Sequence, residues 1–193
     1  MVEFALALPL VLGVAVGGLE CANVALAHLR VSQIATTTAD TTARVLTRMD
    51  ETDVEEAFAG VDVLGRRIDF AANGRVVLSS LEPHDEGMGK SGVKIVWQRC
   101  HGSLSVSSNY GGVSTSSGNN KIKNGIGPEG RKLLVSRDTN IMLVEVTYDY
   151  QPLIYDFLNV GNIRYEAAFN VRERTNFDIT NTANRPVKSC PIS

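Results

Sequence analysis

Residues 4–19, FALALPLVLGVAVGGL, decide the fold, because they form a run of sixteen uncharged and almost entirely apolar residues. Glu20 follows this run, and the apolar character then continues through Leu29, just before the first basic residue, Arg30. A helix of ~20 residues, rising ~1.5 Å per residue, crosses a hydrocarbon core of ~30 Å. The run therefore predicts a membrane-spanning helix. Glu20 must then lie near an interface or face a protein partner, because an unpaired carboxylate at the bilayer centre costs roughly 2.5–3.5 kcal/mol or more.

A cleavable secretory signal is the alternative interpretation of this segment. Such a signal needs a basic start, an apolar stretch of ~7–15 residues and small residues at the cleavage site. Residues 25–27 (ALA) fit the small-x-small pattern, but residues 1–3 (MVE) are acidic rather than basic. Because the helical pattern also continues beyond residue 27, we expect a retained anchor.

Length and charge limit the possible partners. With 193 residues, the sequence suits one ordinary domain plus an appendage, since domains usually contain ~100–200 residues. The formal net charge of -2 provides no general attraction to nucleic acid, which is bound through many clustered Lys and Arg side chains. We therefore expect no nucleic-acid partner.

A stalk is predicted to continue the apolar helix. From Val31 onward, apolar residues recur at spacings of three and four without Pro or Gly, which predicts one helix to about residue 48. This gives a division into a hydrophobic helix and stalk, residues 1–48, and an extracytoplasmic β-rich domain, residues 49–193. A second, short helix is expected to begin at Asp53 and to end by Gly65.

Alternating apolar residues predict the strands. Residues 68–70 and 76–78 flank Asn73-Gly74, which favours a tight type I′ hairpin turn. Three further strands follow from period-two alternation around residues 93–98, 142–150 and 163–172, and Val93, Ile95 and Trp97 are expected to share one sheet face. The predicted fold class is α+β, with a long N-terminal helix backing half-buried antiparallel strands.

The segment from Ser103 to Gly130 is rich in Ser, Gly and Asn, with few apolar residues. Such a composition buries too little surface to order itself independently. We expect residues 103–130 to be a long flexible insertion between strands. Two roles remain open, a mobile surface loop and a contact surface for subunits or an external target.

Three cysteines have different expected roles. Cys100 ends a predicted strand and Cys190 lies near the C-terminus, both in the part placed outside the cytoplasm, where disulfides persist. We predict that they pair, with two free thiols as the alternative. Cys21 lies in the anchor and is expected to be a small buried residue.

Motifs for catalysis, metal and cofactor binding are weak. Cys100, Cys190 and the histidines lack the short paired spacings of zinc sites, and residues 87–91 (GMGKS) lack the first glycine and the following helix of a phosphate loop. Nucleophilic catalysis needs a base beside a Ser or Cys, and no local signature connects the three histidines. We expect no catalytic, metal or cofactor site and no enzyme; the histidines are His28, His84 and His101.

Two stretches resemble a known family. Residues 2–10 (VEFALALPL) resemble the VEFALxLP signature of TadE-like and TadF-like pseudopilins of tight-adherence pilus systems. Residues 146–153 (VTYDYQPL) resemble a late strand motif of the same family. The first motif covers about ten residues and is the more specific. The resemblance implies a pilin-like architecture and a role in assembling or forming an envelope filament.

The resemblance also implies partners and a location. These are a prepilin peptidase, the inner-membrane assembly machinery, other pilin subunits or copies of the chain itself, and the lipid bilayer. The protein would lie in the bacterial inner membrane with its C-terminal domain outside, or in an extracellular filament. Family members carry a basic leader ending in Gly, whereas here two residues precede Glu3.

The resemblance and the helix pattern together suggest assembly residues. Glu3 and Phe4 belong to the signature, and Glu3 matches the pilin glutamate that pairs with a neighbour's N-terminal amine; an interfacial Glu at a helix N-terminus is the alternative. Pro9 is expected to kink or open the helix. Gly13 and Gly17 have the small-xxx-small spacing that supports helix packing in lipid.

The interpretation that combines these features is a pseudopilin or minor pilin that assembles through its N-terminal helix. The competing class is a membrane-anchored receptor or adhesin, with residues 103–130 as its ligand surface. A filament component should depend on Glu3 and Pro9, whereas a simple anchor should tolerate changes at both.

Overall fold

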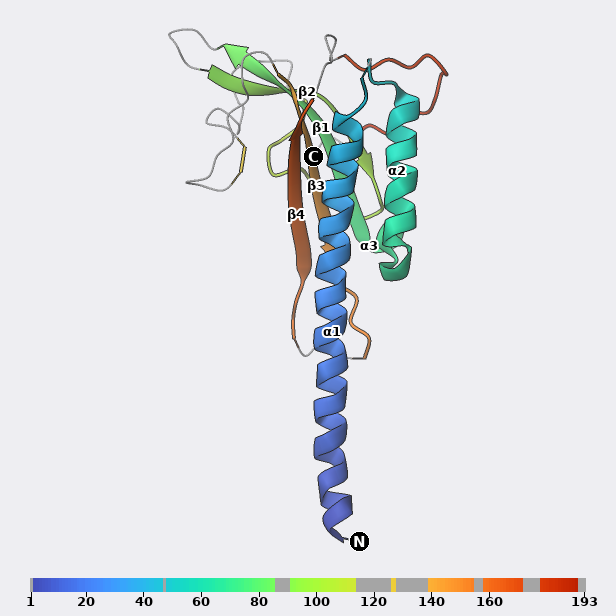
Figure 1. Ribbon diagram of the computed structural model, residues 1–193, viewed down its shortest axis with the longest axis vertical. Coiled ribbons are helices and arrows are strands. Elements are labelled where there is room, and N and C mark those ends of the chain that lie inside the picture. The colour runs from blue at the N-terminus through green and yellow to red at the C-terminus, as the bar shows by residue number, and fades with distance from the viewer. Residues whose placement is uncertain are drawn as a thin grey trace.

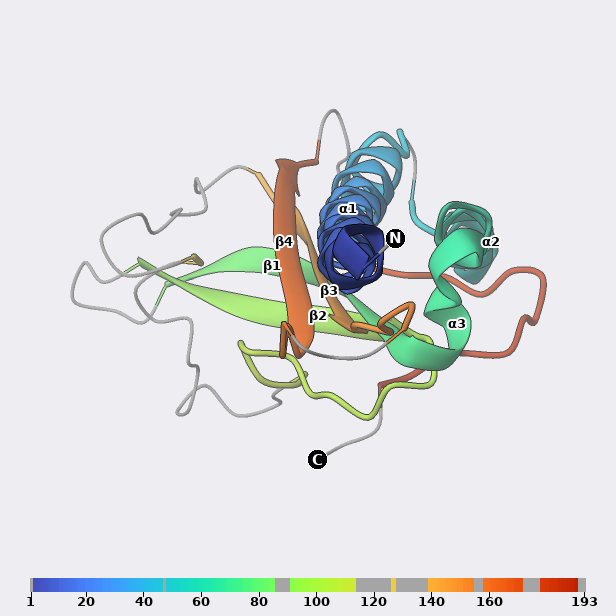
Figure 2. The same cartoon turned by 90° about the horizontal axis from the view of Figure 1, so that it is seen from below.

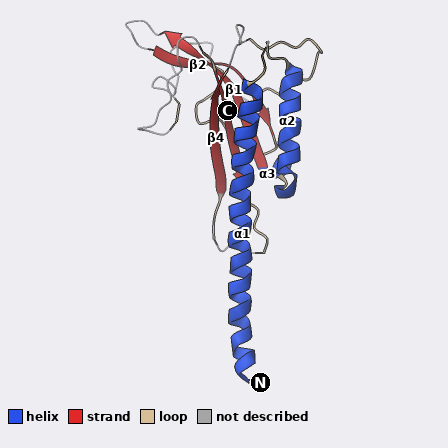
Figure 3. Cartoon of the chain, viewed as in Figure 1, coloured by secondary structure: helices blue, strands red, loops and turns tan. Residues whose placement is uncertain are grey.

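The computed structural model describes residues 2–46, 48–85, 91–113, 126–127, 139–154, 158–171 and 178–190, without the side chains of 2–6, 84–85 and 91–92. The helices are α1 (Val2–Ala43), α2 (Glu51–Gly65), the 3₁₀ helix η1 (Arg66–Ile68) and α3 (Phe70–Asn73). The strands are β1 (Gly74–Asp85), β2 (Ser91–His101), β3 (Ile141–Asp149) and β4 (Asn162–Asn170). The α+β class is confirmed (Figure 3).

The strands form an antiparallel sheet in the order β2-β1-β3-β4. One face of this sheet is covered by α1, and α2 runs beside α1 (Figure 2). The long strand β1 is central and pairs with both β2 and β3. The main core therefore lies between α1, α2 and the sheet.

The helix α1 has two physically different halves. Its C-terminal half contacts β3, β4 and α2, and its N-terminal half projects far beyond the rest of the chain (Figure 1). Buried positions recur every three or four residues, as expected for one helical face. These positions are Glu20, Ala27, Val31, Ile34, Ala35, Thr38, Ala39, Thr42 and Ala43.

The end of α1 differs from the prediction, because the helix stops at Ala43 rather than near residue 48. The backbone next pairs with the C-terminal segment, since Glu51 N–H donates to Thr180 O over 2.9 Å and Thr180 N–H to Met49 O over 2.9 Å. Asp50 then caps α2 by accepting from Thr52 N–H, and Asp53 completes a capping box. The second helix thus begins two residues before the predicted start and ends at Gly65.

The predicted hairpin at Asn73-Gly74 is wrong. Residues 70–73 form the short helix α3, and Gly74 has an extended φ of -122° rather than the positive φ of a type I′ turn. The positive φ occurs earlier, at Asp69, which has a φ of 48° between η1 and α3. Here the chain therefore passes from a helix into a strand. The antiparallel pair that replaces the predicted hairpin is formed by β1 and the next strand in the sequence, β2.

The expectation of half-buried strands holds for β4, where buried Ile163 and Ala167 lie between exposed or partly exposed positions, but β3 is buried on both faces. In β3, all positions except Asp149 are buried. A second apolar cluster covers the face opposite α1; it contains Leu81, Val93, Ile95, Ile126, Ile141 and Leu143. The sheet therefore has core on both sides.

A β-bulge corrects the predicted face of β2. The register shifts between Ser80 and Leu81, so that Trp97 lies opposite Ser80 and Ile95 opposite Leu81. Val96 is the extra residue on β2. Trp97 consequently joins the main core, whereas Ile95 joins the second cluster.

The disulfide between Cys100 and Cys190 is present, which confirms the predicted pair. It joins the end of β2 to the C-terminal segment, and Cys100 N–H also donates to Lys188 O over 2.8 Å. The expectation for Cys21 is wrong, since this free thiol is exposed on α1. The helix turns Cys21 away from the face that packs on the sheet.

Reducing the disulfide should lower the free energy of unfolding. The bond closes a loop between residues separated by 90 positions, and chain entropy assigns such a loop up to about 4–5 kcal/mol. We expect a Cys100→Ala/Cys190→Ala variant of the detergent-solubilised chain to unfold at a lower urea concentration. Cys21→Ser is the control and should unfold like the unaltered chain. Equal midpoints for all three proteins would contradict a stabilising disulfide.

Candidate functional site

The junction between the two halves of α1 is built around the carboxyl group of Glu20. This side chain is 1% exposed, although it lies in the most apolar helix of the chain. Tyr150 O–H donates to Glu20 Oε1 over 2.5 Å, and Leu153 N–H donates to Glu20 Oε2 over 3.2 Å. Both oxygens of a buried polar group are therefore satisfied, as burial requires.

Tyr150 is the centre of this arrangement. Its hydroxyl donates to Glu20 and also accepts from Asn23 Nδ2 over 2.6 Å, so that two positions of α1 bind one phenol. Burial, followed by the bond to Glu20, raises the pKa of Tyr150 to about 12. The phenol therefore stays protonated, and able to donate, well above neutral pH.

The junction also divides the helix surface. On the N-terminal side of Glu20, large apolar side chains are exposed; they are Leu8, Leu10, Val11, Leu12, Val14 and Leu19. The eighteen residues of Val2–Leu19 span ~27 Å at ~1.5 Å per residue, close to the ~30 Å of a hydrocarbon core. Among the described residues, one helix, in the range Ala7–Ala43, is long and apolar enough to cross a membrane.

The sequence-predicted assembly residues lie on this projecting half. Glu3 and Phe4 are part of α1 by backbone, and their side chains lie outside the described residues. Pro9 is exposed and α1 continues through it. Gly13 has open space where a Cβ would lie, and Gly17 is half-buried. Among the described side chains, neither Pro9 nor the two glycines contribute to the hydrogen bonds of the Glu20 junction, which sequence reasoning did not identify.

A polar network covers the sheet face opposite α1. Glu145 accepts from Ser108 Oγ and, over 2.8 Å, from Asn109 N–H. Tyr110 O–H donates to Glu166 Oε2 over 2.6 Å. Burial raises the pKa of Glu145. These bonds join Ser108, Asn109 and Tyr110 to the sheet, while residues 114–125 and 128–130 of the expected insertion lie outside the described residues.

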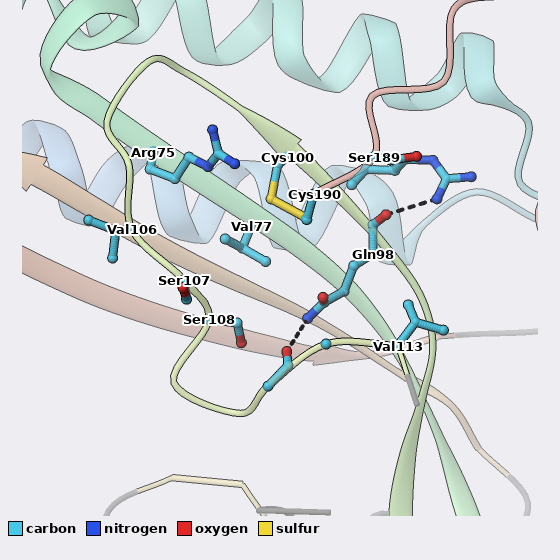
Figure 4. A pocket seen from close by; sticks show the side chains of 13 residues that line it. Arg75, Val77, Gln98, Cys100, Val106, Ser107, Ser108, Val113, Ser189 and Cys190 are labelled. Atoms are coloured by element: carbon cyan, nitrogen blue, oxygen red, sulfur yellow. Dashed lines mark hydrogen bonds between the residues drawn. A yellow bond between two sulfur atoms is a disulfide. The ribbon is translucent and has the colours of Figure 1, made fainter. Parts of the chain in front are cut away.

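A cavity of about 540 Å³ lies between this segment and the disulfide (Figure 4). Arg75 lines it and donates from Nη1 to Gly102 O over 3.0 Å, while its buried Nε has no acceptor. Gln98 Nε2 donates to Gly111 O over 2.9 Å and closes one side. The lining combines two arginines, Arg75 and Arg99, with the disulfide and uncharged polar and aliphatic groups, without a nucleophile–base pair among its described residues.

The histidines with described side chains have structural surroundings. His28 Nδ1 lies 3.3 Å from the Tyr165 hydroxyl, and His101 Nε2 lies 2.6 Å from Asp62 while its ring stacks on Phe58. The side chain of His84 lies outside the described residues. Within the described part of the chain, no group of three or more His, Cys, Asp or Glu side chains could hold a metal ion.

The architecture defines the class of protein: an α+β domain carried by a single projecting apolar helix. Residues 1–40 match the family model described as TadE-like protein, which confirms the resemblance of the N-terminal segment to TadE-like proteins of tight-adherence pilus systems. This family is structural and pilus-associated. No curated protein and no solved structure matches the chain. The matched residues include Glu20, and the late motif includes Tyr150, so the Glu20–Tyr150 bond joins the two resembling segments.

Replacing Tyr150 by Phe should destabilise the domain, because Glu20 then keeps only one hydrogen bond. Loss of a hydrogen bond to such a buried group costs about 1.5–3 kcal/mol. We expect chemical unfolding in detergent to show this decrease. Tyr165→Phe is the matched control and should cost less, because the Tyr165 hydroxyl has a longer contact, 3.3 Å, to His28.

The unaltered chain and Tyr150→Phe also test the raised pKa of Tyr150. Between the ordinary tyrosine pKa of 10 and the folded value of about 12, the native chain holds a proton that the unfolded chain has lost. Stability is therefore fully present below pH 10 and falls as the pH rises toward 12. Tyr150→Phe should show a smaller decrease over this range. Parallel pH profiles for the two proteins would contradict the assignment.

Proposed function

We propose that this chain is a structural subunit, a pseudopilin or minor pilin, of a bacterial tight-adherence-type pilus or envelope filament. The observation that supports this function most directly is the projecting half of α1, which is apolar, long enough to span a bilayer and part of the segment that matches the TadE-like family. A soluble domain gains nothing by exposing such a surface, whereas a membrane or a bundle of neighbouring helices would cover it.

The proposed arrangement has two functional parts. Residues 1–48 provide the anchor and stalk, and residues 49–193 form the domain outside the cytoplasm. The C-terminal half of α1 belongs to the same core as the sheet, so the domain is rigidly attached to the anchor. In this arrangement the chain resides in the inner membrane before it assembles with pilin subunits or copies of itself, through the assembly machinery and a prepilin peptidase.

Assembly is proposed to use residues on the projecting half. Glu3 would pair with a neighbour's N-terminal amine, because a carboxyl group among apolar helices needs a partner. Phe4 would pack beside it. Gly13 has open space around its Cα, and Gly17 lies one helical turn further, so together they would allow a second helix to approach closely.

A membrane-anchored binding module remains the second candidate, and one observation favours it. The cavity beside Cys100–Cys190 contains the buried Arg75 Nε without an acceptor, and burial lowers the pKa of Arg75. An adhesin of this kind would need α1 only as an anchor. Changes in Glu3 or Pro9 would then leave its location unchanged.

Expression of the native gene, with and without the peptidase and assembly genes, tests the proposal. We expect a shortened chain in sheared surface material only when those genes are present. Glu3→Ala and Pro9→Ala should each reduce that material at least about tenfold, which corresponds to ~1.4 kcal/mol of lost interaction. Leu46→Ala is the control, because Leu46 is exposed beyond the end of α1. An uncleaved chain that remains in the membrane fraction under both conditions would favour the binding module.

A further inference from the structure

The described parts of the connection between β3 and β4, residues 150–154 and 158–161, lie at the end of the domain from which the projecting half of α1 extends (Figure 1). Leu153, Ile154 and Leu158 form an apolar tip in these parts. Leu153 and Ile154 are each 63% exposed, and Leu158 is 39% exposed. These side chains do not belong to either apolar cluster of the domain. These apolar side chains are therefore available to a partner outside the fold.

The level of this tip along α1 is fixed by a hydrogen bond. Leu153 N–H donates to Glu20 Oε2, so the tip lies at the point where the exposed apolar surface of α1 begins. Leu19, the neighbour of Glu20, is 60% exposed. The tip thus lies at the level where the helix surface that, under the proposed function, enters the bilayer begins.

Two basic residues lie next to the tip. Arg66 and Arg67, in η1 directly after α2, are exposed and line a cavity of about 480 Å³ together with Pro152 and Leu153. Asp69 is the acidic residue of the same lining. No ion pair between described residues involves either arginine. Aliphatic side chains beside unpaired arginines are the composition of segments that lie in the headgroup region of anionic bilayers.

We infer that the β3–β4 tip is a second membrane contact, in which Leu153 and Ile154 enter the headgroup boundary and Arg66 and Arg67 face anionic lipid phosphates. This inference rests on the proposed anchoring of α1. Helix and tip together would fix the orientation of the domain on the bilayer, because two separate contacts prevent the tilt that one helix allows. A second copy of the chain is the competing occupant of the tip.

Quenching by brominated lipids tests this contact in the full chain. Trp97 is the single tryptophan and is buried in the main core, so it provides an internal reference. Leu153→Trp in vesicles of equal parts phosphatidylcholine and phosphatidylglycerol should lose up to about half of its emission, since one of two tryptophans lies at headgroup depth. Leu46→Trp and Val63→Trp are matched controls, because the replaced side chains are each 64% exposed elsewhere, and should show little quenching.

A further variant separates this inference from the proposed anchoring. Leu10→Trp reports the spanning helix and should be strongly quenched. If Leu10→Trp is quenched and Leu153→Trp is not, the membrane contact of the tip is wrong while anchoring stands. If neither is quenched, anchoring itself is wrong. Emission of Leu153→Trp that depends on protein concentration, and not on brominated lipid, would assign the tip to a second copy and overturn the inference.

The arginines are tested with the same probe. Adding Arg66→Gln and Arg67→Gln to Leu153→Trp should reduce the quenching in phosphatidylglycerol vesicles. In phosphatidylcholine alone, the proteins with and without the two substitutions should be quenched equally. Quenching that is identical in both lipid mixtures and unaffected by the substitutions would contradict the role of the arginines.

Discussion

The structure depends on how one carboxyl group is accommodated in an apolar helix. Glu20 would be costly both in lipid and in a dry core, and the chain satisfies it with the hydroxyl of Tyr150 and the amide of Leu153. Because these donors belong to the end of β3 and the following loop, they hold the sheet domain at one level of α1. The same bond therefore marks where the domain ends and where the exposed apolar surface begins.

Other features follow from this placement. The half of α1 beyond Glu20 is used for the core, where it packs between the sheet and α2, and the half before Glu20 is left to external partners. On the other side of the sheet, residues 103–113 bury Glu145 and complete a second cluster. The disulfide and the capped start of α2 then tie the C-terminal segment to the same body. The result is a domain joined firmly to its helix.

Much of this fold could be predicted from local pattern. The apolar run and the alternation in β3 and β4 each have a period that determines the structure, and the positions of Cys100 and Cys190 predicted their pairing. The failures have physical causes. Asn73 ends a short helix and Gly74 caps it, where a strand and a turn were predicted, and the bulge at Ser80/Leu81 places Trp97 in the main core, apart from Val93 and Ile95. The junction was missed because Glu20 and Tyr150 are 130 residues apart, and only tertiary structure brings them together.

A double-mutant cycle on Glu20 and Tyr150 tests the central claim most directly. The free energies of unfolding of the unaltered chain, Glu20→Gln, Tyr150→Phe and the double variant would be measured in the same detergent. If the bond connects helix and domain, the two effects are coupled, with an interaction energy of about 1 kcal/mol or more. Effects that add within ~0.3–0.5 kcal/mol would show that the two side chains act independently and would contradict the account.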